Sequence, residues 1–169
     1  MRDTAVIAIR DQLGAEIAEA IHSLEERRVD TAVRLGNGEM TATMLASGGR
    51  GHYTVDRLLN YCEPLGLEPK MTVTGLNEGE PEPRVNRRRA HVEPDFTPSG
   101  VLRKQLIHAI AHQIATSGIS RDELAEQTGI PSTTLSTLRS EDIRRFRVDK
   151  LIELAAKLGL DVELTVHPA

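Results

Sequence analysis

The chain has 169 residues and a formal net charge of −4, with 39% hydrophobic, 27% charged and 2% aromatic residues. The mean hydropathy is −0.30, no apolar run is long enough to cross a bilayer, and the first residues lack the basic start of a secretory signal, so we expect a cytoplasmic protein without a membrane partner. The net negative charge excludes a protein that binds nucleic acid non-specifically over its whole surface. The low aromatic content excludes a surface on which the bases of single-stranded nucleic acid stack.

An internal repeat organises the chain. At the shift that carries Gly66 onto Gly159, residues 4–74 align on residues 97–167 without a gap. The matched segments are Gln12-Leu13 with Gln105-Leu106, Ile17-Ala18 with Ile110-Ala111, and Val55-Asp56-Arg57-Leu58 with Val148-Asp149-Lys150-Leu151. This ungapped match predicts a tandem duplication, with one domain at residues 1–74, a linker at 75–98 and a second domain at 99–169.

The first copy is expected to contain the helices of the shared fold and to end in a strand at Leu67–Thr74. Cys62, the single cysteine, lies in an apolar helical stretch, where it is expected to be a small buried hydrophobe. The following linker is rich in proline and charge. Its arginine run at 87–89 has two interpretations, a solvated segment partly balanced by glutamates or a basic arm that follows DNA.

Four helices in succession are predicted for the second copy. Its first helix is predicted from Leu102, Leu106, Ile110 and Ile114, which recur at helical spacing before Gly118. A second helix is expected between Ser120, a plausible N-cap, and Gly129, which would close it.

A short third helix is predicted from about Pro131 to Arg139, with Leu135 and Leu138 facing the core. A fourth helix is expected to end at Gly159. Alternating apolar and polar residues from Leu160 to His167 then predict a strand with one buried face.

The segment from Glu123 through Gly129-Ile130-Pro131-Ser132-Thr133-Thr134-Leu135 to Leu138 resembles the helix-turn-helix core of the Cro and lambda-repressor-like (XRE) family. The continuation from Phe146 through Leu158-Gly159-Leu160 to Val166 is similar to a HigA-like antitoxin branch of that family, which ends in a β-strand. The resemblance implies a mainly α fold of two tandem helix-turn-helix domains, each with about four helices and a C-terminal β-strand.

The resemblance also implies sequence-specific binding of double-stranded DNA, with the third helix of the second copy in the major groove. The resemblance implies that Ser132, Thr133 and Thr137 face bases, with Thr134 and Ser136 beside them. Residues implied to meet phosphates are Arg121, Arg139, Arg144, Arg145 and Arg147.

The first copy departs from this pattern at its reading helix. Glu39, Met40 and Met44 stand where the second copy has Ser132, Thr133 and Thr137. A glutamate directed at DNA is repelled by phosphates. We therefore interpret the first copy mainly as a partner fold for the second, with DNA contact of altered or no sequence preference as the alternative.

Two other function classes compete with transcriptional regulation. One is a protein-interaction module on the same scaffold, which would account for the acidic net charge. Examples are an antitoxin that binds a toxin and a subunit of a larger nucleoprotein complex. An enzyme is not expected, because no catalytic arrangement and no cofactor motif can be recognised. His108 and His112 have the spacing of a metal pair but lack a third ligand, and helix packing or solvation explains them better.

The two terminal strands are expected to pair with each other. A lone strand leaves its backbone donors and acceptors unpaired, and antiparallel pairing of residues 67–74 with 160–167 would satisfy them. Such a sheet would bury Met71 and Val73 with Val162, Leu164 and Val166. The linker is long enough for an intramolecular pseudo-dimer, and it equally allows a strand swap that gives a homodimer.

Overall fold

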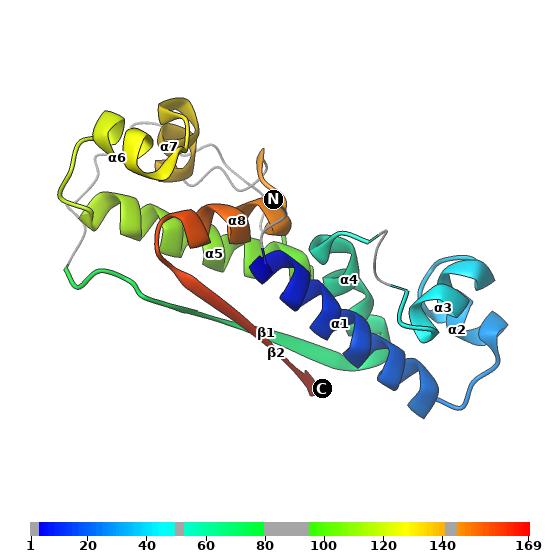
Figure 1. The fold of residues 1–169 in the computed structure, drawn as a ribbon. Coiled ribbons are helices and arrows are strands. Elements are labelled where there is room, and N and C mark those ends of the chain that lie inside the picture. Colours follow the sequence, from blue (N-terminus) through cyan, green and yellow to red (C-terminus); the bar gives the residue numbers. More distant parts are fainter. Residues whose placement is uncertain (1–3, 50–52, 80–94, 141–144) are drawn as a thin grey trace. The chain divides into compact units, whose positions relative to one another are not determined.

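The computed structural model describes residues 4–49, 53–79, 95–140 and 145–169 (Figure 1). The chain divides into two compact units. The first unit comprises Met1–Thr72 together with Glu163–Ala169, and the second comprises Val73–Val162. The fold is mainly helical with a two-stranded antiparallel sheet, as the sequence predicted.

The first unit begins with a long helix, followed by three short helices, a 3-10 turn and a strand. These elements are α1 (Thr4–Ser23), α2 (Arg28–Arg34), α3 (Glu39–Ala46), α4 (Val55–Cys62), η1 (Glu63–Leu65) and β1 (Leu67–Thr74). Helix α1 packs against α3 and α4, and α2 packs against α3. Leu13 and Ile17 of α1 and Leu58 of α4 have no exposed surface and form the core of this unit. The expected strand at Leu67–Thr74 is confirmed.

Helix α4 is fixed at its start by a cap and an aromatic pair. The Thr54 hydroxyl accepts a hydrogen bond from the Arg57 backbone N–H at 3.3 Å. Tyr53 is buried and meets Tyr61 edge to face, with the Arg57 guanidinium 5.3 Å from the Tyr53 ring centre. At the other end of the helix Cys62 is buried as expected, and this burial raises the pKa of its thiol to about 12.

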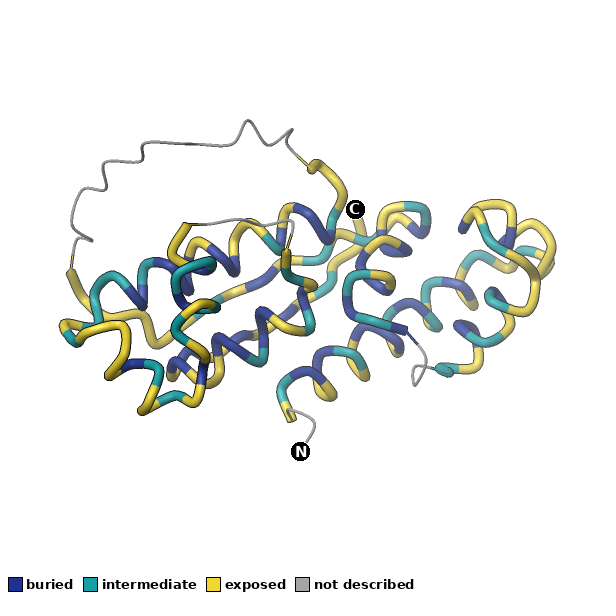
Figure 2. The backbone as a smooth tube through the Cα atoms, turned by 90° about the horizontal axis from the view of Figure 1, so that it is seen from above, coloured by how far each residue is buried: buried dark blue, intermediate teal, exposed yellow. Residues whose placement is uncertain are grey.

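The second unit contains the four helices predicted for the second copy. They are α5 (Pro98–Thr116), α6 (Arg121–Thr128), α7 (Ser132–Arg139) and α8 (Val148–Lys157). Strand β2 (Asp161–Pro168) follows, and from Glu163 onward it belongs to the first unit. Helix α5 packs against α7 and α8, while α6 packs against α7. Buried stretches alternate with exposed ones along the helices (Figure 2), and Leu106 and Ile110 of α5 have no exposed surface.

Two details of the second unit concern the start of α7 and the aromatic residue before α8. Helix α7 begins at Ser132, because Pro131 is its N-cap and has an extended ψ of 139°. Phe146, which occupies the repeat position of Tyr53, is only half-buried, whereas Tyr53 is buried. The two aromatics therefore do not anchor their units equally.

The predicted pairing of β1 with β2 is confirmed. At one end of the ladder the Ala169 N–H donates to the Gly66 carbonyl at 2.8 Å. Met71, Val162 and Leu164 are buried, while Val73 and Val166 are half-buried. The side chains between these positions are exposed, so the sheet has one apolar and one polar face.

Candidate nucleic-acid interface

Local sequence signals determine where α6 and α7 begin and end. The Ser120 hydroxyl accepts a hydrogen bond from the Glu123 N–H at 3.2 Å, which confirms the predicted N-cap. Gly129 ends α6 in a left-handed conformation, with φ 66°. Leu135 and Leu138 then have no exposed surface and hold α7 on the core. The remaining positions of α7 are polar and are left toward solvent.

The polar side of α7 consists of short hydroxyl side chains. Thr133 is exposed, and Ser132, Thr134, Ser136 and Thr137 are half-buried. The Ser136 and Thr137 hydroxyls donate to the carbonyls of Ser132 and Thr133, each at 3.0 Å. Because their protons point to the helix backbone, the oxygens of these two side chains present acceptor sites.

Arg121 lies against this polar side. Its Nη1 donates to the Ser136 Oγ at 3.0 Å, and its Nε lies 3.5 Å from the Asp122 carboxylate. The Arg121 side chain therefore extends from α6 to α7. It contacts Ser136, which is 15 positions away in the chain. Sequence reasoning assigned Arg121 and Ser136 separately and missed this contact.

The other arginines of the predicted site lie in the last turn of α7 or follow it in the chain. Arg139 is exposed in the last turn of α7, and Arg145 and Arg147 are exposed before α8, where Arg147 is the N-cap residue. Arg144 lies outside the described residues, as does the arginine run at 87–89. An exposed cationic group that flanks a reading helix is suited to a phosphate contact.

The corresponding surface of the first unit has different chemistry. Met40 in the first turn of α3 is 78% exposed, and Val33 in the last turn of α2 is 76% exposed. Glu39, the first residue of α3, is also exposed. The Arg57 side chain donates to Tyr61 Oη at 2.9 Å and to Asn37 Oδ1 at 3.3 Å, so it is held by its own unit. This surface offers apolar and acidic groups where α7 offers hydroxyls.

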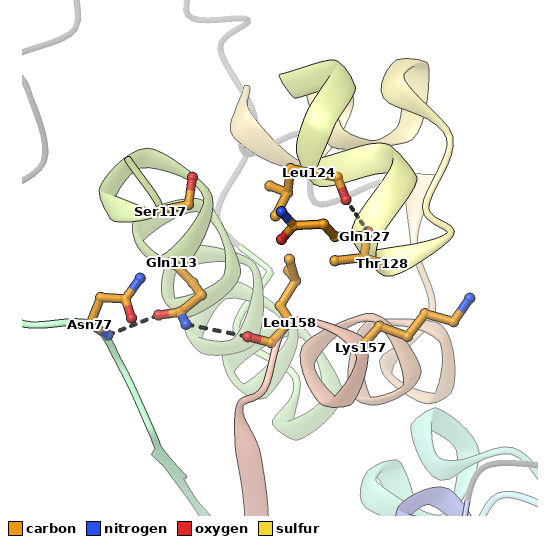
Figure 3. A pocket seen from close by; sticks show the side chains of 8 residues that line it. All are labelled: Asn77, Gln113, Ser117, Leu124, Gln127, Thr128, Lys157 and Leu158. Carbon is orange, nitrogen blue, oxygen red and sulfur yellow. Dashed lines mark hydrogen bonds between the residues drawn. The ribbon is translucent and has the colours of Figure 1, made fainter. Parts of the chain in front are cut away.

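A cavity of about 250 Å³ lies in the second unit between α5, α6 and the end of α8 (Figure 3). Its lining residues are Asn77, Gln113, Ser117, Leu124, Gln127, Thr128, Lys157 and Leu158. Gln113 is buried in its wall. Its Oε1 accepts from the Asn77 N–H at 2.9 Å, and its Nε2 donates to the Leu158 carbonyl at 3.3 Å. Gln113 thus ties the segment after β1 to the C-terminal end of α8, which sequence reasoning also missed.

The histidine pair on α5 has no metal-binding surroundings. His112 Nε2 donates to the Gly79 carbonyl at 3.1 Å. Within the described ranges no cluster of three histidine, cysteine or acidic side chains has the geometry for a metal ion.

Comparison with known proteins finds one similarity, in the second half of the chain. Residues 97–167 match the family model of a helix-turn-helix domain. No curated protein and no solved structure matches the chain significantly. Among the described helices, none combines the length and the apolar character that crossing a membrane requires. Residues 97–167 are therefore similar to a helix-turn-helix domain, a kind of domain that generally suggests DNA binding.

Proposed function

We propose that the protein binds double-stranded DNA sequence-specifically through its second copy, residues 99–169, and regulates transcription in the cytoplasm. The observation that carries the proposal is the contact of Arg121 with Ser136, which puts a cation beside the hydroxyl-rich side of α7 within a helix-turn-helix domain. Such a domain places one helix in the major groove, and flanking cations hold the phosphates.

Each part of the site has a role in this proposal. Ser132, Thr133 and Thr137 face bases, and Thr133 is the most exposed of the three, while Thr134 and Ser136 lie beside them. The phosphate contacts are assigned to Arg121, Arg139, Arg144, Arg145 and Arg147. Because the chain as a whole is acidic, affinity depends on this local cluster of arginines and should fall as salt rises.

The family branch and the duplication are also part of the proposal. We assign the second copy to the XRE type with a HigA-like terminal strand, and residues 1–74 to a diverged first copy joined by the linker 75–98. Support comes from helix positions at the repeat shift, since α2, α3 and α4 begin at Arg28, Glu39 and Val55 and their counterparts begin at Arg121, Ser132 and Val148.

Selection from random double-stranded DNA, followed by titration of the selected sequence, tests the function. The wild-type chain should select a defined sequence. Thr133→Glu should abolish binding, because it brings a carboxylate to the phosphates without disturbing the core. Thr165→Glu makes the same change at an exposed position of β2 and serves as the matched control. Failure of the wild-type chain to bind DNA, or equal binding by Thr133→Glu, would refute the proposal.

A protein-interaction role, as an antitoxin or a subunit of a nucleoprotein complex, is the second candidate function. The exposure of Val33 and Met40 on the first unit favours it, because a surface that reads DNA has little use for exposed apolar side chains. Selection experiments distinguish the two candidates, since a pure interaction module would select no DNA sequence.

A further inference from the structure

The cavity of the second unit has a wall that hydrogen bonds hold in place. In the segment after β1, the Asn77 N–H donates to Gln113 Oε1 at 2.9 Å, and the Gly79 carbonyl accepts from His112 Nε2 at 3.1 Å. Gln113 Nε2 continues this wall to α8 by donating to the Leu158 carbonyl at 3.3 Å. Because these bonds form without a ligand, the cavity is preformed, as small-molecule sites usually are.

The lining of the cavity combines apolar side chains with polar groups that are open to a ligand. Leu124 and Leu158 are buried, and Leu158 points toward Leu124 and Gln127 (Figure 3). The Ser117 hydroxyl donates to the Ile114 carbonyl at 2.9 Å, so its oxygen still presents an acceptor site. The Gln127 carboxamide forms no hydrogen bond with the described residues. It therefore offers two N–H donors and a carbonyl acceptor, which complement a second carboxamide.

The charge at the rim of the cavity favours an anion. Among the lining residues, all of which the structure describes, none is acidic and Lys157 alone is charged. The exposed Lys157 side chain extends outward at the edge of the cavity in Figure 3, and it forms no ion pair within the described ranges. A carboxylate can meet this ammonium group on the solvent side. It then avoids the desolvation penalty that a buried charge would carry.

We propose that this cavity binds a small organic monocarboxylate that also carries a carboxamide. The carboxamide pairs with Gln127, the carbon chain contacts Leu124 and Leu158, and the carboxylate stays at the rim beside Lys157. The volume of about 250 Å³ is below the roughly 300–1,000 Å³ of pockets for drug-sized ligands, so the ligand is about the size of a four-carbon acid. The lining includes no residue of α7, so the site is separate from the proposed DNA-reading surface and does not depend on that proposal.

Titration of the full chain with succinamate, a four-carbon carboxylate that ends in a carboxamide, tests the site by NMR without DNA. A ligand of this size should bind with a dissociation constant on the order of millimolar. At constant ionic strength, the backbone amide signals of Leu124, Gln127 and Leu158 should shift and approach saturation by about 20 mM. Succinamide, which is neutral, should bind about two- to fivefold more weakly. Butyrate lacks the carboxamide and should bind about two- to twelvefold more weakly.

Two substitutions at exposed positions assign these preferences to their side chains. Gln127→Leu should weaken succinamate binding about two- to twelvefold without weakening butyrate binding. Lys157→Met should remove the preference for succinamate over succinamide. Gln105→Leu and Lys104→Met are matched controls, because both residues are exposed on α5 outside the cavity. The proposal would be overturned by the absence of a saturable shift at about 20 mM succinamate, by shifts at residues away from the cavity, or by binding that both substitutions leave unchanged.

Discussion

Removal of the Arg121 side chain should weaken DNA binding in a way that depends on salt. One arginine–phosphate contact contributes about 0.9 to the slope of log K against log salt. At about 0.1 M salt, one decade below 1 M, Arg121→Ala should therefore cost about 0.9 log units, which is roughly an eightfold loss of affinity. Fluorescence anisotropy titrations of the selected DNA at several salt concentrations measure both quantities.

Ser136 should act through Arg121. Its hydroxyl accepts from the guanidinium at 3.0 Å and so holds a flexible side chain in place before DNA arrives. Ordering such a side chain on binding costs about 0.5–1.5 kcal/mol. Ser136→Ala should lower affinity by about 2- to 12-fold with an unchanged salt slope. Ser136→Thr keeps a hydroxyl and should restore most of the affinity.

A double-mutant cycle separates positioning from direct base reading. When Arg121 is already alanine, Ser136→Ala should have almost no further effect. If Ser136 instead contacts a base, its loss should persist in the Arg121→Ala background and change the preferred sequence. Independent effects of the two substitutions would refute the reasoning, and thermal melts of each variant control for unfolding.

Three further predictions concern stability. Gln113→Met keeps the side-chain length but leaves two backbone hydrogen-bond partners unsatisfied, so urea unfolding should show that the free energy of unfolding falls by about 2 kcal/mol or more. A fall below about 0.5 kcal/mol would contradict the proposed linking role of Gln113. Phe146→Ala should cost about 1–2 kcal/mol, less than a buried ring, because Phe146 is half-buried; a loss of about 3 kcal/mol or more would indicate full burial. The hydrogen bond from the Thr97 hydroxyl lowers the pKa of Asp95, so this carboxylate stabilises the fold above its usual pKa and the stabilisation is lost as pH falls through the lowered pKa. The stability difference between wild type and Asp95→Ala should accordingly shrink on acidification, and a difference independent of pH would refute this assignment.

The helices and their ends could be predicted from sequence because their signals are local. The cap at Ser120, the left-handed Gly129 and the buried Leu135 and Leu138 all follow from neighbouring residues and helical period. The strand pairing was also predictable. A lone strand has unpaired backbone N–H and C=O groups, and two such strands in one chain can pair these groups with each other. The match to a helix-turn-helix domain agrees with these local patterns.

The polar contacts were decided by tertiary structure. Arg121 reaches Ser136 only because α6 packs against α7, and Gln113 reaches the Leu158 carbonyl, 45 residues away, only because α5 packs against α8. The half-exposure of Phe146, despite its repeat relation to buried Tyr53, likewise follows from packing. Periodicity indicates which side of a helix is buried, but not the rotation and axial position at which two helices dock. Those two quantities determine which long polar side chains can meet.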